Sequence, residues 1–117
     1  MSEKSIFSKI MDGEIPSDIL YQDEHFICVK DIAPQAPTHL LLIPRKPIPR
    51  IADATPEDQS VLGHLMLKAG EIARDLGVDE AFRLVINNGA GAGQTVFHLH
   101  VHLLAQKQFK EGSLGMS

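Results

Sequence analysis

The sequence has little of what marks secreted or membrane-spanning proteins. It contains no tryptophan, one tyrosine and a single cysteine, Cys28, which excludes an internal disulfide and favours a reducing compartment. No stretch approaches the roughly 18 consecutive apolar residues that a membrane span needs. We expect no signal peptide at residues 1–4, because no basic start followed by an apolar run is present. We therefore expect a cytoplasmic protein that does not associate with membranes.

Positive charge is also scarce. The chain has 15 acidic and 11 basic residues, which gives a formal net charge of −4. Proteins that bind DNA or RNA polymers usually carry a basic face, so a nucleic-acid polymer is not an expected partner. A small phosphate ester remains compatible, because a local site can offer N–H donors inside an acidic protein. The 117 residues suit one compact domain, which we expect to span 1–117.

Cap residues and apolar periodicity predict two helices. A short helix begins after Ser5, a good N-cap, and ends near Met11. A long helix begins after the N-cap Thr55 and ends at Gly77. The apolar stripe of the long helix comprises Val61, Leu62, Leu65, Ala69, Ile72, Ala73 and Leu76.

Five segments are predicted to be strands: 19–22, 26–30, 38–44, 82–87 and 96–104. The first two form a hairpin around an Asp23-Glu24 turn, and proline makes segments 31–37 and 44–49 irregular. The expected fold class is therefore α+β, with a five-stranded antiparallel sheet, one long helix and one short helix.

Three of the six histidines follow one another at alternate positions, in the segment His98-Leu99-His100-Val101-His102. Because side chains alternate along a strand, the three imidazoles would share one face while Leu99 and Val101 point to the core. Neighbouring imidazoles repel one another when protonated and need partners when neutral, so this is not an ordinary core face.

Three interpretations of these histidines are open. The first is a solvated polar face. The second is a zinc site, but His98 and His102 would lie about 13 Å apart on a strand and could not both reach an ion bound by His100. Such a site would need other ligands, for which Cys28 and His39 are available. The third and favoured interpretation is a catalytic cluster, since imidazole can be both nucleophile and proton carrier near neutral pH.

A glycine-rich segment, 87–95, leads directly into the histidines. It lacks the Lys-Ser/Thr end of a nucleotide-triphosphatase loop, and a predicted strand follows where that motif needs a helix. It is either a flexible hairpin connection or a loop whose N–H groups approach an anion closely.

Several blocks together resemble one known family. Segment 98–104 has the pattern His-x-His-x-His-x-x with apolar x, and segments 5–10, 14–16, 31–39 and 93–98 extend the likeness over most of the chain. The sequence resembles the histidine-triad (HIT) superfamily and, within it, the branch of histidine triad nucleotide-binding proteins. The resemblance implies a homodimer with one continuous sheet across both subunits. It also implies hydrolysis of purine nucleoside phosphoramidates, such as adenylated amines, to the monophosphate and free amine.

The same resemblance implies roles for particular residues. His100 matches the nucleophile, which forms a nucleotidyl-histidine, and His39, His98 and His102 match its supporting histidines. Asp31 matches the carboxylate that binds the ribose hydroxyls. The positions matching the base pocket are Phe7, Ile10, Val29 and Ile32, and those matching ribose and phosphate contacts are Asn87, Gly93, Gln94 and Thr95. Neither a cofactor nor a metal ion is implied.

The chain departs from the family pattern after Leu104. Relatives typically continue with Gly-Gly-Arg, whereas residues 105–109 here read Ala-Gln-Lys-Gln-Phe and the chain ends with residues 115–117. The preference for the leaving amine is therefore open. Hydrolysis of dinucleoside polyphosphates and a nucleotide-binding adaptor role are the competing functions. The remaining histidines, His25 and His64, are expected at the surface.

Overall fold

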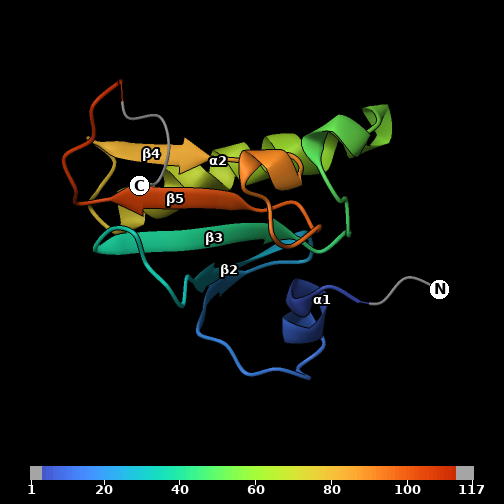
Figure 1. Ribbon diagram of the computed structural model, residues 1–117. Coiled ribbons are helices and arrows are strands. Elements are labelled where there is room, and N and C mark those ends of the chain that lie inside the picture. The colour runs from blue at the N-terminus through green and yellow to red at the C-terminus, as the bar shows by residue number, and fades with distance from the viewer. Residues whose placement is uncertain (1–3, 113–117) are drawn as a thin grey trace.

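The computed structural model describes residues 4–112, which form two α-helices and five strands (Figure 1). The helices are α1 (Ile6–Met11) and α2 (Gln59–Asp75), and the strands are β1 (Ile19–Gln22), β2 (Phe26–Lys30), β3 (Thr38–Pro44), β4 (Phe82–Val85) and β5 (Val101–Ala105). The five strands form one antiparallel sheet in the order β1-β2-β3-β5-β4. This confirms the expected α+β architecture. The last residues named above, 115–117, lie outside the described part of the chain.

Local signals explain where the elements begin. The Ser5 side chain accepts a hydrogen bond from the Ser8 N–H at 3.0 Å, as an N-cap of α1 should. Ahead of α2, a single 3₁₀ turn (Pro56–Asp58) follows Thr55, whose N–H donates to the Asp58 carboxylate at 2.9 Å. In the β1–β2 turn, the Asp23 carboxylate accepts the N–H groups of His25 and of Phe26, the first residue of β2.

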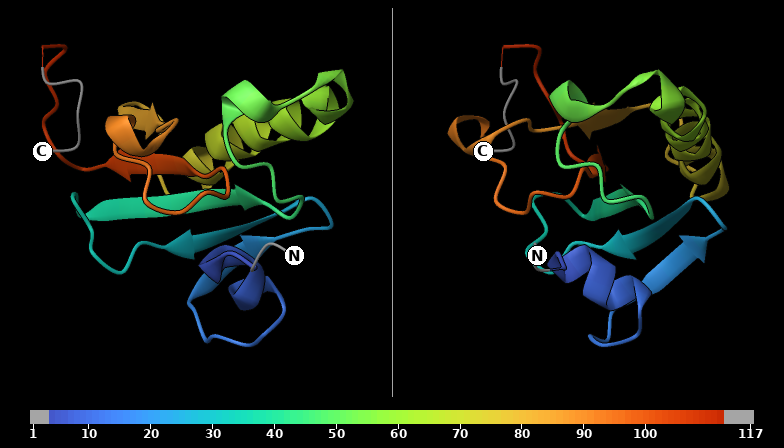
Figure 2. Two further views of the ribbon diagram at one scale, coloured as in Figure 1. Left: turned by 45° about the vertical axis from the view of Figure 1, so that its right-hand side comes forward. Right: turned by 90° about the vertical axis from the view of Figure 1, so that its right-hand side faces the viewer.

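The two helices cover opposite faces of the sheet (Figure 2). On one face, the buried residues Leu65, Ala69 and Ile72 of α2 pack against the larger core cluster of the sheet. On the other face, Phe7 of α1 packs against a smaller cluster made by Ile27, Val29, Leu41 and Ile43. Leu76, expected in the apolar stripe, is instead 42% exposed because it follows the last residue of α2.

The last two strands are shorter than predicted. β5 begins at Val101 rather than at 96, because β3 ends at Pro44, whose nitrogen has no hydrogen to donate. The Leu99 N–H donates instead to the Ile48 carbonyl at 2.7 Å, in the proline-rich connection. β4 ends at Val85, two residues earlier than predicted, where its pairing with β5 stops at the Val85–His102 pair. Two of the three clustered histidines therefore precede the strand.

Among the described residues, no helix is both long and apolar enough to cross a bilayer.

Candidate active site

His98 is fully buried, and both of its ring nitrogens are engaged. Nε2 lies 2.7 Å from the Pro44 carbonyl oxygen, and Nδ1 lies 2.7 Å from the Ser5 hydroxyl oxygen. A carbonyl can only accept, so Nε2 carries the proton and Nδ1 accepts from the hydroxyl. His98 thus joins the end of β3 to the start of α1 and acts as an anchor of the site.

His100 has the opposite tautomer. Its Nδ1 lies 2.8 Å from the His98 carbonyl oxygen and must therefore donate, which leaves the lone pair on Nε2. The Phe7 ring meets the imidazole edge to face, with centroids 4.9 Å apart, and the His102 ring lies 5.0 Å away. An unprotonated, fixed ring nitrogen is what a nucleophilic histidine requires.

A chain of hydrogen bonds orients His102. The Gln35 backbone N–H donates to Nδ1 of His39 at 3.0 Å, so the proton of a neutral His39 is on Nε2. That Nε2 lies 2.9 Å from Nδ1 of His102 and 3.3 Å from Oδ2 of Asp31. Because Nδ1 of His102 accepts, a neutral His102 carries its proton on Nε2. His100 and His102 thus offer a lone pair and an N–H side by side.

Burial lowers the pKa of all four of these histidines. The effect is largest at His102, where burial and then the nearby His100 and His39 lower the pKa to about 4, with Asp31 opposing them. The cluster is therefore neutral at pH 7. This burial also contradicts the interpretation as a solvated polar face.

Asp31 lies at the edge of this cluster. Its Oδ1 accepts the Ala33 N–H at 2.8 Å and caps the loop, while Oδ2 faces His39. The side chain is 17% exposed, so the carboxylate remains reachable from solvent. The adjacent Ile32, matched to the base pocket, is 97% exposed and is not a buried pocket wall.

The other residues matched to the base pocket lie in α1 or in the sheet beneath it. Phe7 and Val29 are buried, and Ile10 is partly buried against the same small core cluster. Phe7 also contacts the rings of His98 and His100. The structure therefore brings this apolar group directly beside the histidines.

The Gln94 side chain holds the glycine-rich loop together. Its Oε1 accepts the Gly89 N–H at 2.8 Å, and its Nε2 donates to the carbonyls of Pro49 and Val96 at 2.7 and 3.0 Å. The residue is only 3% exposed. Since its amide is engaged within the chain, a contact from this position to a ligand would come from the backbone.

The loop needs glycine at two positions, because Gly89 and Gly93 have φ values of +92° and +93°. A Cβ on Gly93 would lie 3.8 Å from Nδ2 of Asn87, so these two residues are neighbours. Thr95 is exposed at the end of the loop. Asn87 and Gly93 thus lie side by side in the loop that precedes the histidines.

Comparison with known proteins identifies the family. A model described as the HIT domain matches residues 12–109. The chain belongs to the HIT domain family. An uncharacterized HIT-like protein of Synechocystis sp. is 59% identical over 109 residues, which cover 93% of this chain and 96% of that relative.

Solved HIT structures share the fold. A HIT family hydrolase from Legionella pneumophila superposes with a TM-score of 0.89 at 40% identity, covering 92% of this chain and 97% of the other. A histidine triad nucleotide-binding protein from Candida albicans gives a TM-score of 0.81 at 29% identity, covering 90% and 76%. These likenesses confirm the HIT fold expected from the sequence.

Sequence reasoning missed three groups that orient the HIT histidines. Ser5 was recognised only as a helix cap, although its hydroxyl also reaches His98. The Pro44 carbonyl and the Gln35 N–H are backbone groups, and residue type does not reveal their direction. The prolines near both positions predict an irregular backbone, but they do not predict which side chains its peptide groups contact.

One set of side chains has the spacing of metal ligands. Within residues 4–112, single ligand atoms of Asp31, His39 and His102 all lie within 4.8 Å of one another. Cys28, also considered as a ligand, belongs to the core cluster on the α2 face, whereas the HIT histidines lie on the α1 face. Cys28 therefore cannot join them.

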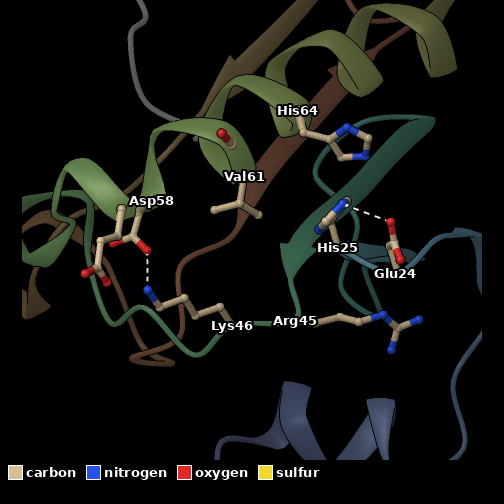
Figure 3. A pocket seen from close by; sticks show the side chains of 9 residues that line it. Glu24, His25, Arg45, Lys46, Asp58, Val61 and His64 are labelled. Carbon is tan, nitrogen blue, oxygen red and sulfur yellow. Dashed lines mark hydrogen bonds and ion pairs between the residues drawn. The ribbon is translucent and has the colours of Figure 1, made fainter.

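A cavity of about 470 Å³ lies away from the histidines, between the β1–β2 turn and the start of α2 (Figure 3). It is lined by Glu24, His25, Arg45, Lys46, Glu57, Asp58, Ser60, Val61 and His64. Lys46 pairs with Asp58, His25 with Glu24, and His64 with Asp23 at 2.6 Å. His64, expected at the surface, is in fact partly buried by this pairing. Of these pairs, the one between His64 and Asp23 joins α2 to the β1–β2 turn.

Proposed function

We propose that this HIT protein hydrolyses purine nucleoside phosphoramidates, including adenylated amines, to the nucleoside monophosphate and the free amine. This would place it in the histidine triad nucleotide-binding branch. The observation that carries the proposal is the pair formed by His100, with a lone pair on Nε2, and His102, with its proton on Nε2. The Legionella relative is described as a hydrolase and the Candida relative as a nucleotide-binding protein, which supports both parts of the proposal.

In the first step, Nε2 of His100 attacks the α-phosphorus and the P–N bond breaks, which leaves a nucleotidyl-histidine. The leaving amine takes up a proton from the histidine cluster, because an unprotonated amine leaves phosphorus poorly. The His102 N–H and the loop near Thr95 stabilise charge on the phosphoryl oxygens. Water then attacks the same phosphorus, releases the monophosphate from His100 and returns the proton. His98 holds His100 in place through its carbonyl oxygen.

The neighbouring groups suit a ribonucleotide. A carboxylate such as Asp31 repels phosphate but can accept hydrogen bonds from the two ribose hydroxyls. A purine that contacts the exposed Ile32 side chain would bury its apolar surface, and this burial would favour binding. Asn87 and the backbone of Gly93 and Gln94 would then contact ribose and phosphate.

The experiment is steady-state hydrolysis of a fluorogenic adenosine phosphoramidate by the native chain and by His100→Ala. We expect turnover to fall by several orders of magnitude while adenosine monophosphate binding changes by less than about tenfold, since the lost interaction is made mainly on the reaction path. His25→Ala, a change at a half-exposed histidine of the cavity beside α2, is the matched control. A His100→Ala variant that keeps more than about a tenth of the native rate would contradict the assignment.

The same assay separates the competing functions. A nucleotide-binding adaptor would bind the monophosphate without turnover of the phosphoramidate. A dinucleoside polyphosphate hydrolase would instead prefer a dinucleotide over the fluorogenic substrate. Either result would replace the proposed activity.

A further inference from the structure

Asp31, His39 and His102 have nearly the geometry of a zinc site. The Asp31 Oδ2 to His39 Nε2 distance is 3.3 Å, His39 Nε2 to His102 Nδ1 is 2.9 Å, and Asp31 Oδ2 to His102 Nδ1 is 4.0 Å. Ligands bound tetrahedrally to zinc at about 2.0–2.1 Å lie about 3.3–3.4 Å from one another.

One backbone group opposes metal binding. A histidine that binds a metal through Nε2 keeps its proton on Nδ1 and donates it to an acceptor. Here Nδ1 of His39 faces the Gln35 N–H at 3.0 Å, which is itself a donor. A proton on Nδ1 would meet another proton, so the proton of His39 is confined to Nε2, where a metal would have to bind.

We propose that the Gln35 backbone N–H selects a hydrogen-bond chain over a metal centre at this site. By keeping the His39 proton on Nε2, it makes Nδ1 of His102 an acceptor and Nε2 of His102 a donor. Gln35 is therefore a positioning residue that acts through His39. Its effect on catalysis rests on the proposed function, whereas its effects on tautomer and on metal binding do not.

Hydrogen bonds at Ala33 and at Gln35 fix the loop that carries this N–H. The Asp31 carboxylate accepts the Ala33 N–H, and the Gln35 side-chain amide donates to the Ala33 carbonyl at 3.1 Å. Lys107 donates to the Gln35 carbonyl at 3.2 Å. The segment after Leu104, where the chain departs from the family pattern, thus helps to orient the Gln35 peptide groups.

The tautomers can be measured directly on the native chain. In ¹⁵N-histidine NMR spectra at pH 7, we expect His39 and His102 to carry their protons on Nε2 and His100 to carry its proton on Nδ1. This measurement needs neither substrate nor metal, so an absence of phosphoramidate turnover would leave it intact. A His39 proton on Nδ1 would overturn the proposal.

Gln35→Pro removes the N–H, and Gln35→Ala is the matched control that keeps it. In the proline variant, we expect His39 to populate both tautomers and zinc chloride to bind at least about tenfold more tightly by calorimetry on untagged protein. Its kcat should fall with little change in KM. His39→Ala in the proline background should abolish the gained zinc binding.

Two results would overturn this inference. One is a proline variant whose tautomers and zinc affinity equal those of the native chain. The other is an alanine variant that changes as much as the proline variant, which would assign the effect to the side chain. If the proline variant fails to fold, the tautomers of the native chain decide the question alone.

Discussion

His98, His100 and His102 are identical side chains at alternate positions, yet each has different hydrogen-bond partners. His98 uses both ring nitrogens, His100 keeps a lone pair, and His102 keeps an N–H. A histidine's role follows from which nitrogen is protonated, and its neighbours decide that. At the scale of the residue, the chemistry of this site therefore depends on the hydrogen-bond partners of each histidine.

Asp31 is expected to select ribonucleotides. Hydrogen bonds to a charged acceptor contribute about 1.5–3 kcal/mol each, before the loss of water contacts. Asp31→Ala should thus weaken ribonucleoside monophosphate binding about ten- to a hundredfold and weaken 2′-deoxynucleotide binding much less. Calorimetric titration of both ligands into both proteins measures this, and Asp31→Asn controls for the loop cap. Equal weakening of both ligands would leave Asp31 as a cap of the loop only.

The buried histidines make stability depend on pH. In the unfolded chain, His102 titrates near 6.5, whereas burial lowers its pKa in the folded protein to about 4. The unfolded state therefore binds more protons between these values, so stability is complete above about pH 6.5 and declines as pH falls toward 4. For His102 alone, the loss should be about 2 kcal/mol at pH 5 and about 3 kcal/mol once the pH lies below 4. Urea unfolding at pH 7.5 and pH 5 measures it, with a weaker dependence expected in His102→Gln. Equal stability at both pH values would contradict the buried, neutral state.

The sequence predicts which residues form this site better than it predicts their geometry. The clustered histidines, His39 and the glycines of the loop could be predicted, because each belongs to a recognisable pattern. The 97% exposure of Ile32 could not be predicted, since a sequence pattern does not report exposure. The tautomers could not be predicted, because they depend on Ser5, Pro44 and Gln35, which are distant in sequence or act through the backbone.

At the scale of the element, α1 is short and depends on its cap. Ser5 serves both the Ser8 N–H and Nδ1 of His98, so Ser5→Ala leaves two groups without this partner. We expect a loss of about 1–2 kcal/mol in the free energy of unfolding. Urea denaturation measures it, with Ser5→Thr retaining most stability and Ser60→Ala, at an exposed position of α2, as control. A Ser5→Ala loss no greater than that of Ser60→Ala would contradict the double role.

The helices and the first three strands could be predicted from caps, turns and apolar patterns. The ends of β4 and β5 could not, because a strand continues only where a partner offers hydrogen bonds. Pro44 removes that partner, and the chain before Val101 turns to Ile48 instead. The same interruption frees His98 to reach the Pro44 carbonyl, which a continued strand would not allow.

At the scale of the whole molecule, we expect a twofold-symmetric homodimer with one sheet across both subunits. β4 is an edge strand of the described sheet, and α2 exposes Met66 and Leu67 at 43% and 76%. Pairing would cover such apolar surface. Light scattering at micromolar concentration should give twice the 12.8 kDa chain mass. A clean monomer mass would contradict this expectation.

The separation of the core into two clusters on opposite faces of the sheet has a consequence for motion. The small cluster under α1 covers His98 and His100, while the larger cluster under α2 holds the rest of the sheet. A segment with little buried area opens at lower free energy than the whole domain. Amide protons of α1 should therefore exchange with deuterium through a sub-global opening, well before those of β3. That opening would uncover the histidines while the larger core stays folded, so the site can loosen without unfolding of the protein.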